Sequence, residues 1–188
     1  MELPTTIEGC LEALRNKPSY SDDSDEAIDY RIHQHANAAT VATPRLNEIV
    51  DIVRTLPKEA LCAPKSTGAE ILSYIEFCDW QKQSQYPYSG KFTDAYLHAA
   101  NDKNPELLHL EYVNGEDDGY PEYGRIDVPT SWLVCPAEEL KKLVLNKIYD
   151  DLLAHIDKLR REVDKTEEAK DMLWDRFSEY LISPPRQH

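Results

Sequence analysis

The last quarter of the chain constrains the fold most, because no glycine or proline interrupts residues 137–183. Apolar residues recur there at helical spacing and predict a long helix that begins at Pro136. These residues are Leu140, Leu143, Val144, Ile148, Leu152, Ile156, Leu159 and Val163. Because residues 164–166 interrupt the stripe, we expect a bend there, with a second helix to Leu181 folding back. The alternative is one helix of about 45 residues, about 65 Å long.

Four helices are expected earlier in the chain, each with its own start signal. They cover residues 5–16, 25–41, 43–56 and 67–83. Thr43 and Pro44 are typical of an N-cap and a first helical position, so the helices on either side are expected to be separate. Capping boxes mark two other starts, at Thr5 with Glu8 and at Thr67 with Glu70.

A change of periodicity after residue 106 predicts β-structure. Leu108, Leu110 and Tyr112 alternate with polar residues, which indicates a strand, and a second strand is expected over 125–134. The segment between them is expected to turn at Asn114-Gly115 and continue as a loop, while residues 93–101 are expected to form a short helix.

The predicted fold class is therefore α+β, mostly α. It has a helical N-terminal part, one antiparallel β-hairpin at about 107–134 and a C-terminal pair of long helices. The expected domains are an acidic α+β unit, a helical hairpin packed on it and a frayed tail. Their ranges are 1–135, 136–183 and 184–188.

The charge is strongly negative and unevenly distributed. The chain has 21 basic and 35 acidic residues, a net charge of −14. Residues 1–135 hold 23 acidic against 11 basic residues, whereas residues 136–182 hold 12 against 9. Direct binding to nucleic acid or to an anionic membrane requires a basic surface, so we expect neither.

Several features favour a cytoplasmic location. No apolar run is long enough to span a bilayer, and the N-terminus lacks the basic and apolar regions of a signal peptide. The four cysteines form no CxxC pair or short disulfide framework, so we expect them to be reduced and mostly buried.

Two acidic clusters and the loop tyrosines near them are the predicted partner-binding residues. Tyrosine supplies contact area at low entropy cost, and carboxylates one helical turn apart lie about 6 Å apart, close to the spacing of DNA phosphates. The first cluster is Asp22, Asp23, Asp25, Glu26 and Asp29. The second is Glu116, Asp117, Asp118, Glu122 and Asp127, of which all but Asp127 are predicted to contact the partner. The tyrosines are Tyr86, Tyr88, Tyr120 and Tyr123. The alternative interpretation is a solvated surface that aids solubility.

The chain carries no recognisable catalytic, metal-binding or phosphate-binding motif, so we predict no catalytic residue, metal or cofactor. His33 and His35 would point apart on a helix, and His98, His109 and His155 are scattered. A metal site that the fold assembles from His33 or His35 with Asp22 or Asp25 is an alternative. Glu111 and Asp127, on the two hairpin strands, would form an acid–base pair only if they faced each other.

Three functional hypotheses follow from these observations. The first is a non-enzymatic binding or inhibitor protein whose acidic surface docks on a basic surface of a nucleic-acid-handling protein. In composition the chain resembles acidic viral inhibitors that imitate DNA, including phage proteins directed against restriction or CRISPR systems; the resemblance is one of charge and covers no motif. The second hypothesis is an assembly or adaptor protein that uses its C-terminal helices for a homodimer or a partner. The third is an enzyme whose site forms only in the folded chain.

Overall fold

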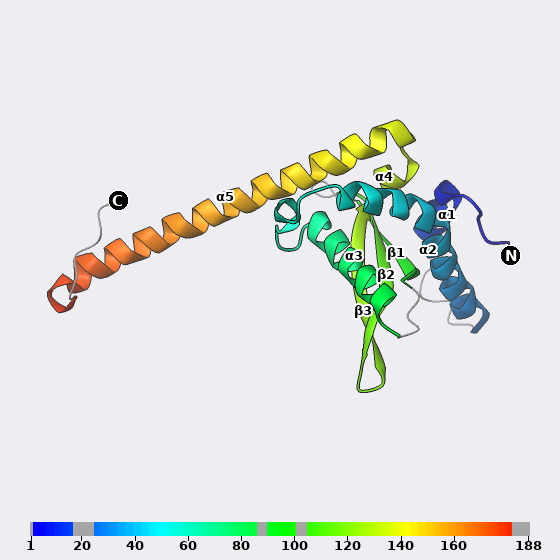
Figure 1. Ribbon diagram of the computed structural model, residues 1–188, viewed down its shortest axis with the longest axis horizontal. Helices are drawn as coiled ribbons and strands as arrows, with labels where there is room; N and C mark the ends of the chain where they lie inside the picture. Colours follow the sequence, from blue (N-terminus) through cyan, green and yellow to red (C-terminus); the bar gives the residue numbers. More distant parts are fainter. Residues whose placement is uncertain (1, 17–24, 86–89, 101–104, 182–188) are drawn as a thin grey trace.

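The computed structural model describes residues 2–16, 25–85, 90–100 and 105–181, and it is mostly helical with one small sheet (Figure 1). The predicted fold class is confirmed. The elements in chain order are α1 (Ile7–Arg15), α2 (Asp25–Arg54), η1 (Lys58–Leu61), α3 (Thr67–Gln83), β1 (Phe92–His98), β2 (Leu107–Asp117), β3 (Tyr120–Pro129), α4 (Thr130–Val134), α5 (Ala137–Phe177) and η2 (Ser178–Tyr180).

The sheet has three antiparallel strands in the order β1-β2-β3. Strand β1 occupies the segment that the sequence predicted as a helix over 93–101, and that prediction is wrong. Ala95 pairs with Leu110, and Leu110 pairs with Ile126, so these three buried residues form a row across the sheet. Pairing with the distant strand β2 therefore decides the conformation of β1, and local periodicity does not reveal such a partner.

The hairpin is longer than expected. Strands β2 and β3 pair as far as Asp117 and Tyr120, so the segment predicted as a loop over 116–124 is mostly strand. The turn lies at Asp118 and Gly119, whose φ angles of +48° and +84° suit a tight two-residue hairpin turn. Strand β3 ends at Pro129, and helix α4 replaces the last five residues of the predicted strand.

Helix α3 covers one face of the sheet (Figure 1). The core beneath it is apolar and includes Ile71, Tyr74, Phe77, Leu110, Tyr112 and Ile126. The first part of α5 contributes Leu140, Val144 and Ile148 to the same core.

Helix α2 runs without a break through Pro44, so the expected separation of two helices at 41–43 is wrong. An internal proline removes one backbone hydrogen bond. Here Ala39, Ala42 and Leu46 are all buried on the two sides of Pro44, and their packing holds both halves of the helix in line.

The N-caps of α1 and α3 lie one residue from the predicted positions. Thr6 accepts a hydrogen bond from the Gly9 backbone, and Ser66 accepts one from Ala69. Because Ser66 caps α3, Glu70 is free to contact strand β3 instead of closing a capping box.

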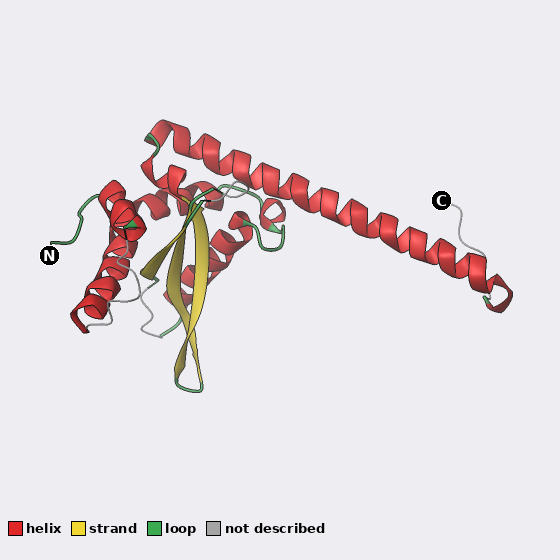
Figure 2. Ribbon diagram, turned by 180° about the vertical axis from the view of Figure 1, so that it is seen from behind, coloured by secondary structure: helices red, strands yellow, loops and turns green. Residues whose placement is uncertain are grey.

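Helix α5 is continuous over 41 residues, so the expected C-terminal helical pair is wrong. Residues 164–166 interrupt the apolar stripe but keep helical geometry, and the Thr166 hydroxyl donates to the Glu162 carbonyl one turn back. The outer half of α5 extends away from the rest of the molecule (Figures 1 and 2). Every residue over 156–173 is exposed. Within the described ranges, no helix has the length and apolar character needed to cross a membrane.

Candidate functional site

The predicted acidic residues fall at two separate places. Asp25, Glu26 and Asp29 are exposed in the first turns of α2. The other predicted residues of this N-terminal cluster, Asp22 and Asp23, lie outside the described residues, as do Tyr86 and Tyr88.

Most of the second cluster comes together at the end of the β2–β3 hairpin, which extends beyond the helices (Figure 1), whereas Asp127 lies farther along β3 beside His109. Tyr120 and Tyr123 are 77% and 58% exposed. The carboxylates beside them are also exposed, and they are Glu116, Asp117, Asp118 and Glu122. We call these six residues the hairpin tip. Strand pairing presents them at one narrow end of the molecule.

Sequence reasoning missed a polar cluster on the sheet face opposite α3. Figure 2 shows this face with the strands in front of the helix. Register places Tyr96, His109 and Asp127 in one row across the three strands, with His98 two residues beyond Tyr96 on β1. His98 and His109, far apart in the sequence, have ring centroids 5.1 Å apart.

His109 lies at the centre of this cluster and is 8% exposed. Its Nδ1 lies 2.5 Å from Asp127 Oδ1, and its Nε2 lies 3.6 Å from Glu111 Oε1. The imidazole therefore stands between the two carboxylates that the sequence placed on the hairpin strands. Glu111 pairs in register with Arg125, so Glu111 and Asp127 do not form a facing acid–base pair.

Neighbouring groups fix both sides of the cluster. The Asp127 backbone N–H donates to Glu70 Oε2 at 2.9 Å, and burial raises the pKa of Glu70. On the other side, the Tyr96 hydroxyl donates to Asp94 Oδ2 at 2.7 Å, a bond that raises the pKa of Tyr96. His35 of α2 meets the Tyr96 ring edge-on, with centroids 4.7 Å apart.

This arrangement orients His109 for one of two kinds of chemistry. In a general base, a carboxylate bonded to one imidazole nitrogen fixes the ring, as Asp127 could do here; in a metal site, the imidazole and the carboxylate can instead bind the same ion. Among the residues that the structure describes, three metal-ligating side chains converge only here: His98, His109 and Asp127.

A second feature is an exposed apolar stripe along the outer half of α5. Its strongly exposed members are Ile156, Leu159, Val163, Leu173 and Phe177. With Leu152, Thr166 and Lys170 they form a heptad pattern of alternating three- and four-residue spacing, and we call these eight residues the α5 seam.

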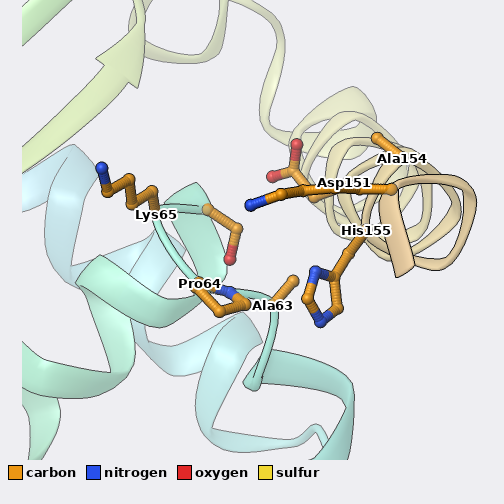
Figure 3. A pocket seen from close by; sticks show the side chains of 8 residues that line it. Ala63, Pro64, Lys65, Asp151, Ala154 and His155 are labelled. Carbon is orange, nitrogen blue, oxygen red and sulfur yellow. The ribbon is translucent and has the colours of Figure 1, made fainter. Parts of the chain in front are cut away.

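A shallow pocket lies where α5 leaves the body, between α5 and the loop that follows η1 (Figure 3). Ala63, Pro64 and Lys65 form one wall, and Asp151 and His155 of α5 face them. Lys147 pairs with Asp151 within α5. The pocket thus marks the end of the contact between α5 and the body.

No family model, curated protein or solved structure matches the chain.

Proposed function

We propose that this protein is a non-enzymatic assembly protein that pairs with a second copy of itself through the α5 seam. One observation carries the proposal: an apolar heptad stripe lies exposed on a helix that leaves the body. Val163, at its centre, is 55% exposed. Soluble proteins seldom leave such a stripe in water unless a partner covers it.

The pattern within the seam favours a coiled coil. Ile156 and Val163 occupy one inward position of the heptad, and Leu159 and Leu173 occupy the other. β-branched residues at the first position and leucine at the second are typical of two-stranded coiled coils. Burying one such side chain fully contributes about 1.5–3 kcal/mol, so several together outweigh the cost of association.

Charges beside the seam favour an antiparallel pair of identical helices. In that orientation Arg160 lies opposite Glu167 of the partner subunit, and the attraction occurs twice. A parallel pair would instead bring Glu162 against Glu167 of the partner subunit and Lys170 against Lys170 of the partner subunit. Like charges in these positions oppose association.

The proposal is tested by sedimentation equilibrium of the full chain and of Val163→Asp. The wild type is expected to dimerise, and Val163→Asp to weaken the dimer at least about 100-fold, because it buries two charges in the seam. Met172→Asp is the matched control, since Met172 is 56% exposed on the opposite side of the helix. A monomeric wild type, or equal effects of the two variants, would rule the proposal out.

Orientation is tested by exchanging charges. Arg160→Glu and Glu167→Arg are each expected to weaken an antiparallel dimer, and the double variant is expected to recover it. In a parallel dimer Glu167→Arg would strengthen association, because Arg would then face Glu162 of the partner subunit.

The hairpin tip supports a second candidate function: docking on a basic surface of a nucleic-acid-handling protein, as an inhibitor does. Its four carboxylates and two exposed tyrosines lie at the end of a projecting hairpin, where they are accessible to a groove. Electrostatic association of this kind is fast and sensitive to salt.

This second candidate is tested by pull-down from host lysate at about 0.1 M and 0.5 M salt, which shortens the screening length from about 10 Å to less than half of that. The bait is compared with Asp117→Lys/Asp118→Lys and with a charge-matched control, Glu138→Lys/Glu139→Lys on α5. A nucleic-acid-handling protein lost at high salt and lost only with the hairpin variant supports docking. Retention by the hairpin variant contradicts it.

A further inference from the structure

We propose that His98, His109 and Asp127 form a binding site for a divalent transition metal of the zinc class. The site lies on the sheet face that α3 leaves open, far along the chain from the α5 seam (Figure 2). It is independent of the assembly function proposed above.

The three side chains come from three different strands whose register is fixed. Their ligand atoms all lie within 4.8 Å of one another. Zinc bonds of about 2.0–2.2 Å in a tetrahedral site require ligand atoms about 3.3–3.6 Å apart. Ligand pairs near the 4.8 Å limit would therefore close by about 1 Å, and His109 Nδ1 and Asp127 Oδ1, now 2.5 Å apart, would separate by about as much.

His109 and Asp127 already face each other in the folded chain. Nδ1 of His109 lies 2.5 Å from Asp127 Oδ1, so these two ligand atoms meet at one point of the sheet. Two ligands of one zinc ion lie farther apart than this, so the pair would separate by about 1 Å to admit the ion.

Glu111 lies just beyond hydrogen-bond distance of His109, where a small side-chain rotation would let its carboxylate orient a metal-bound imidazole. Its Oε1 lies 3.6 Å from His109 Nε2, on the far side of the ring from Asp127. An N–H donated to a carboxylate fixes the ring orientation and raises the basicity of the other nitrogen. The burial of His109 further limits the positions that its ring can take.

The ligand set decides which metal fits. Two imidazoles and one carboxylate suit zinc, cobalt or nickel, whereas calcium and magnesium prefer oxygen ligands alone. Three protein ligands leave a fourth position for water. His98 is exposed, so an ion reaches the site directly from solvent.

The test is titration of the full chain with Zn²⁺ against a chromophoric chelator, together with Co²⁺ absorption spectroscopy. One Zn²⁺ is expected per chain, and the Co²⁺ form is expected to show tetrahedral bands without the sulfur charge-transfer bands that binding by Cys62 would give. His98→Ala is expected to weaken Zn²⁺ binding at least about 100-fold, and Glu111→Gln about 10- to 100-fold.

His33→Ala is the matched control, because His33 is an exposed histidine on α2, outside the cluster. Since His98 is also exposed, both variants are expected to keep the wild-type circular dichroism spectrum. Absence of Zn²⁺ binding at 100 times the protein concentration would overturn the proposal. So would equal Zn²⁺ affinities for the wild type and His98→Ala.

Discussion

At the scale of single residues, the core depends on close packing around one aromatic ring. Tyr112 of β2 lies 4.8 Å from the Tyr74 ring and 5.3 Å from the Phe77 ring, between centroids. Burial raises the pKa of Tyr112 to about 12. On the neighbouring strand its ring lies over Gly124, which pairs with it in register. A side chain at position 124 would occupy the space of the ring.

Gly124→Ala is expected to destabilise the fold by about 1–3 kcal/mol, the usual cost of overpacking a core. The added Cβ would lie 2.2 Å from Tyr112 Cζ, so the ring would have to move within a filled core. Gly115→Ala in β2 is the control, because its Cβ would meet nothing closer than Glu122 Oε2 at 3.5 Å. Urea unfolding measures both; equal midpoints would contradict this packing.

Glu70 is expected to make stability depend on pH. Burial raises its folded-state pKa, so the folded protein holds this proton more tightly than the unfolded chain does. Stability from this group is therefore lost as pH rises above the ordinary value of 4.5 towards the raised folded-state pKa. A glutamine amide at this position has no such proton to lose, and its oxygen still accepts from the Asp127 N–H.

Glu70→Gln should consequently gain stability relative to the wild type between pH 4 and pH 7. Urea unfolding across that range measures the difference in unfolding free energy, with Glu76→Gln, an exposed residue of the same helix, as control. If the difference in unfolding free energy between Glu70→Gln and the wild type stayed constant or fell as pH rises, burial would not be the main influence on the pKa of Glu70.

At the scale of elements, Arg45 connects α2 to the end of α4. Its Nε donates to the Trp132 carbonyl at 3.0 Å, and its Nη2 donates to the Cys135 carbonyl. These acceptors stand just before α5 begins, so Arg45 helps set where that helix starts.

Arg45→Met keeps the apolar stem and removes the charged donors. It is expected to destabilise the fold by about 2–3 kcal/mol, because the Trp132 and Cys135 carbonyls lose charged hydrogen bonds in a mostly buried place. Arg54→Met on the same helix is the control: Arg54 pairs with Asp79 at a more exposed site, where a loss of about 0–1 kcal/mol is expected. Similar losses in the two variants would contradict a special role for Arg45.

The sequence predicted those elements that local signals determine. Periodicity located α1, α3, β2 and the start of α5 to within a few residues, but it placed β3 over 125–134, whereas β3 is Tyr120–Pro129. Strand β1 was missed because its conformation depends on pairing with β2, and α2 was divided because Pro44 is an ordinary helix start that buried alanines override. The heptad stripe of α5 is visible in the sequence, but its exposure depends on the helix not folding back.

The two candidate sites also differ in whether local sequence reveals them. The hairpin tip was predicted because its residues are close in the chain. The His98–His109–Asp127 cluster was not, since β1 was not expected to be a strand, and without its register His98 and His109 appear unrelated. Once β1 is known to be a strand, its pairing with β2 is the signal that brings the two histidines together.

At the scale of the whole molecule, the protein consists of a body and an arm. The body contains the sheet, α1 to α4 and the first part of α5, and the arm is the outer half of α5 (Figures 1 and 2). Leu140, Val144 and Ile148 join the body core, whereas all residues over 156–173 are exposed. The arm therefore adds an interaction surface without adding to the core.

A chain that ends at Glu162 tests this division. It keeps the buried part of α5 and the pocket residues up to Lys158, so at concentrations where both chains are monomeric its urea midpoint is expected to match that of the full chain. A chain that ends at Cys135 loses Leu140, Val144 and Ile148 from the core, and each such loss costs about 2–5 kcal/mol, so this second chain is expected to be largely unfolded. A lower midpoint for the first truncation would show that the arm stabilises the body, and a stably folded second truncation would show that α5 is dispensable to the core. Either result would contradict the division into body and arm. In that division, the stability of the body depends on the first part of α5 and does not depend on its outer half.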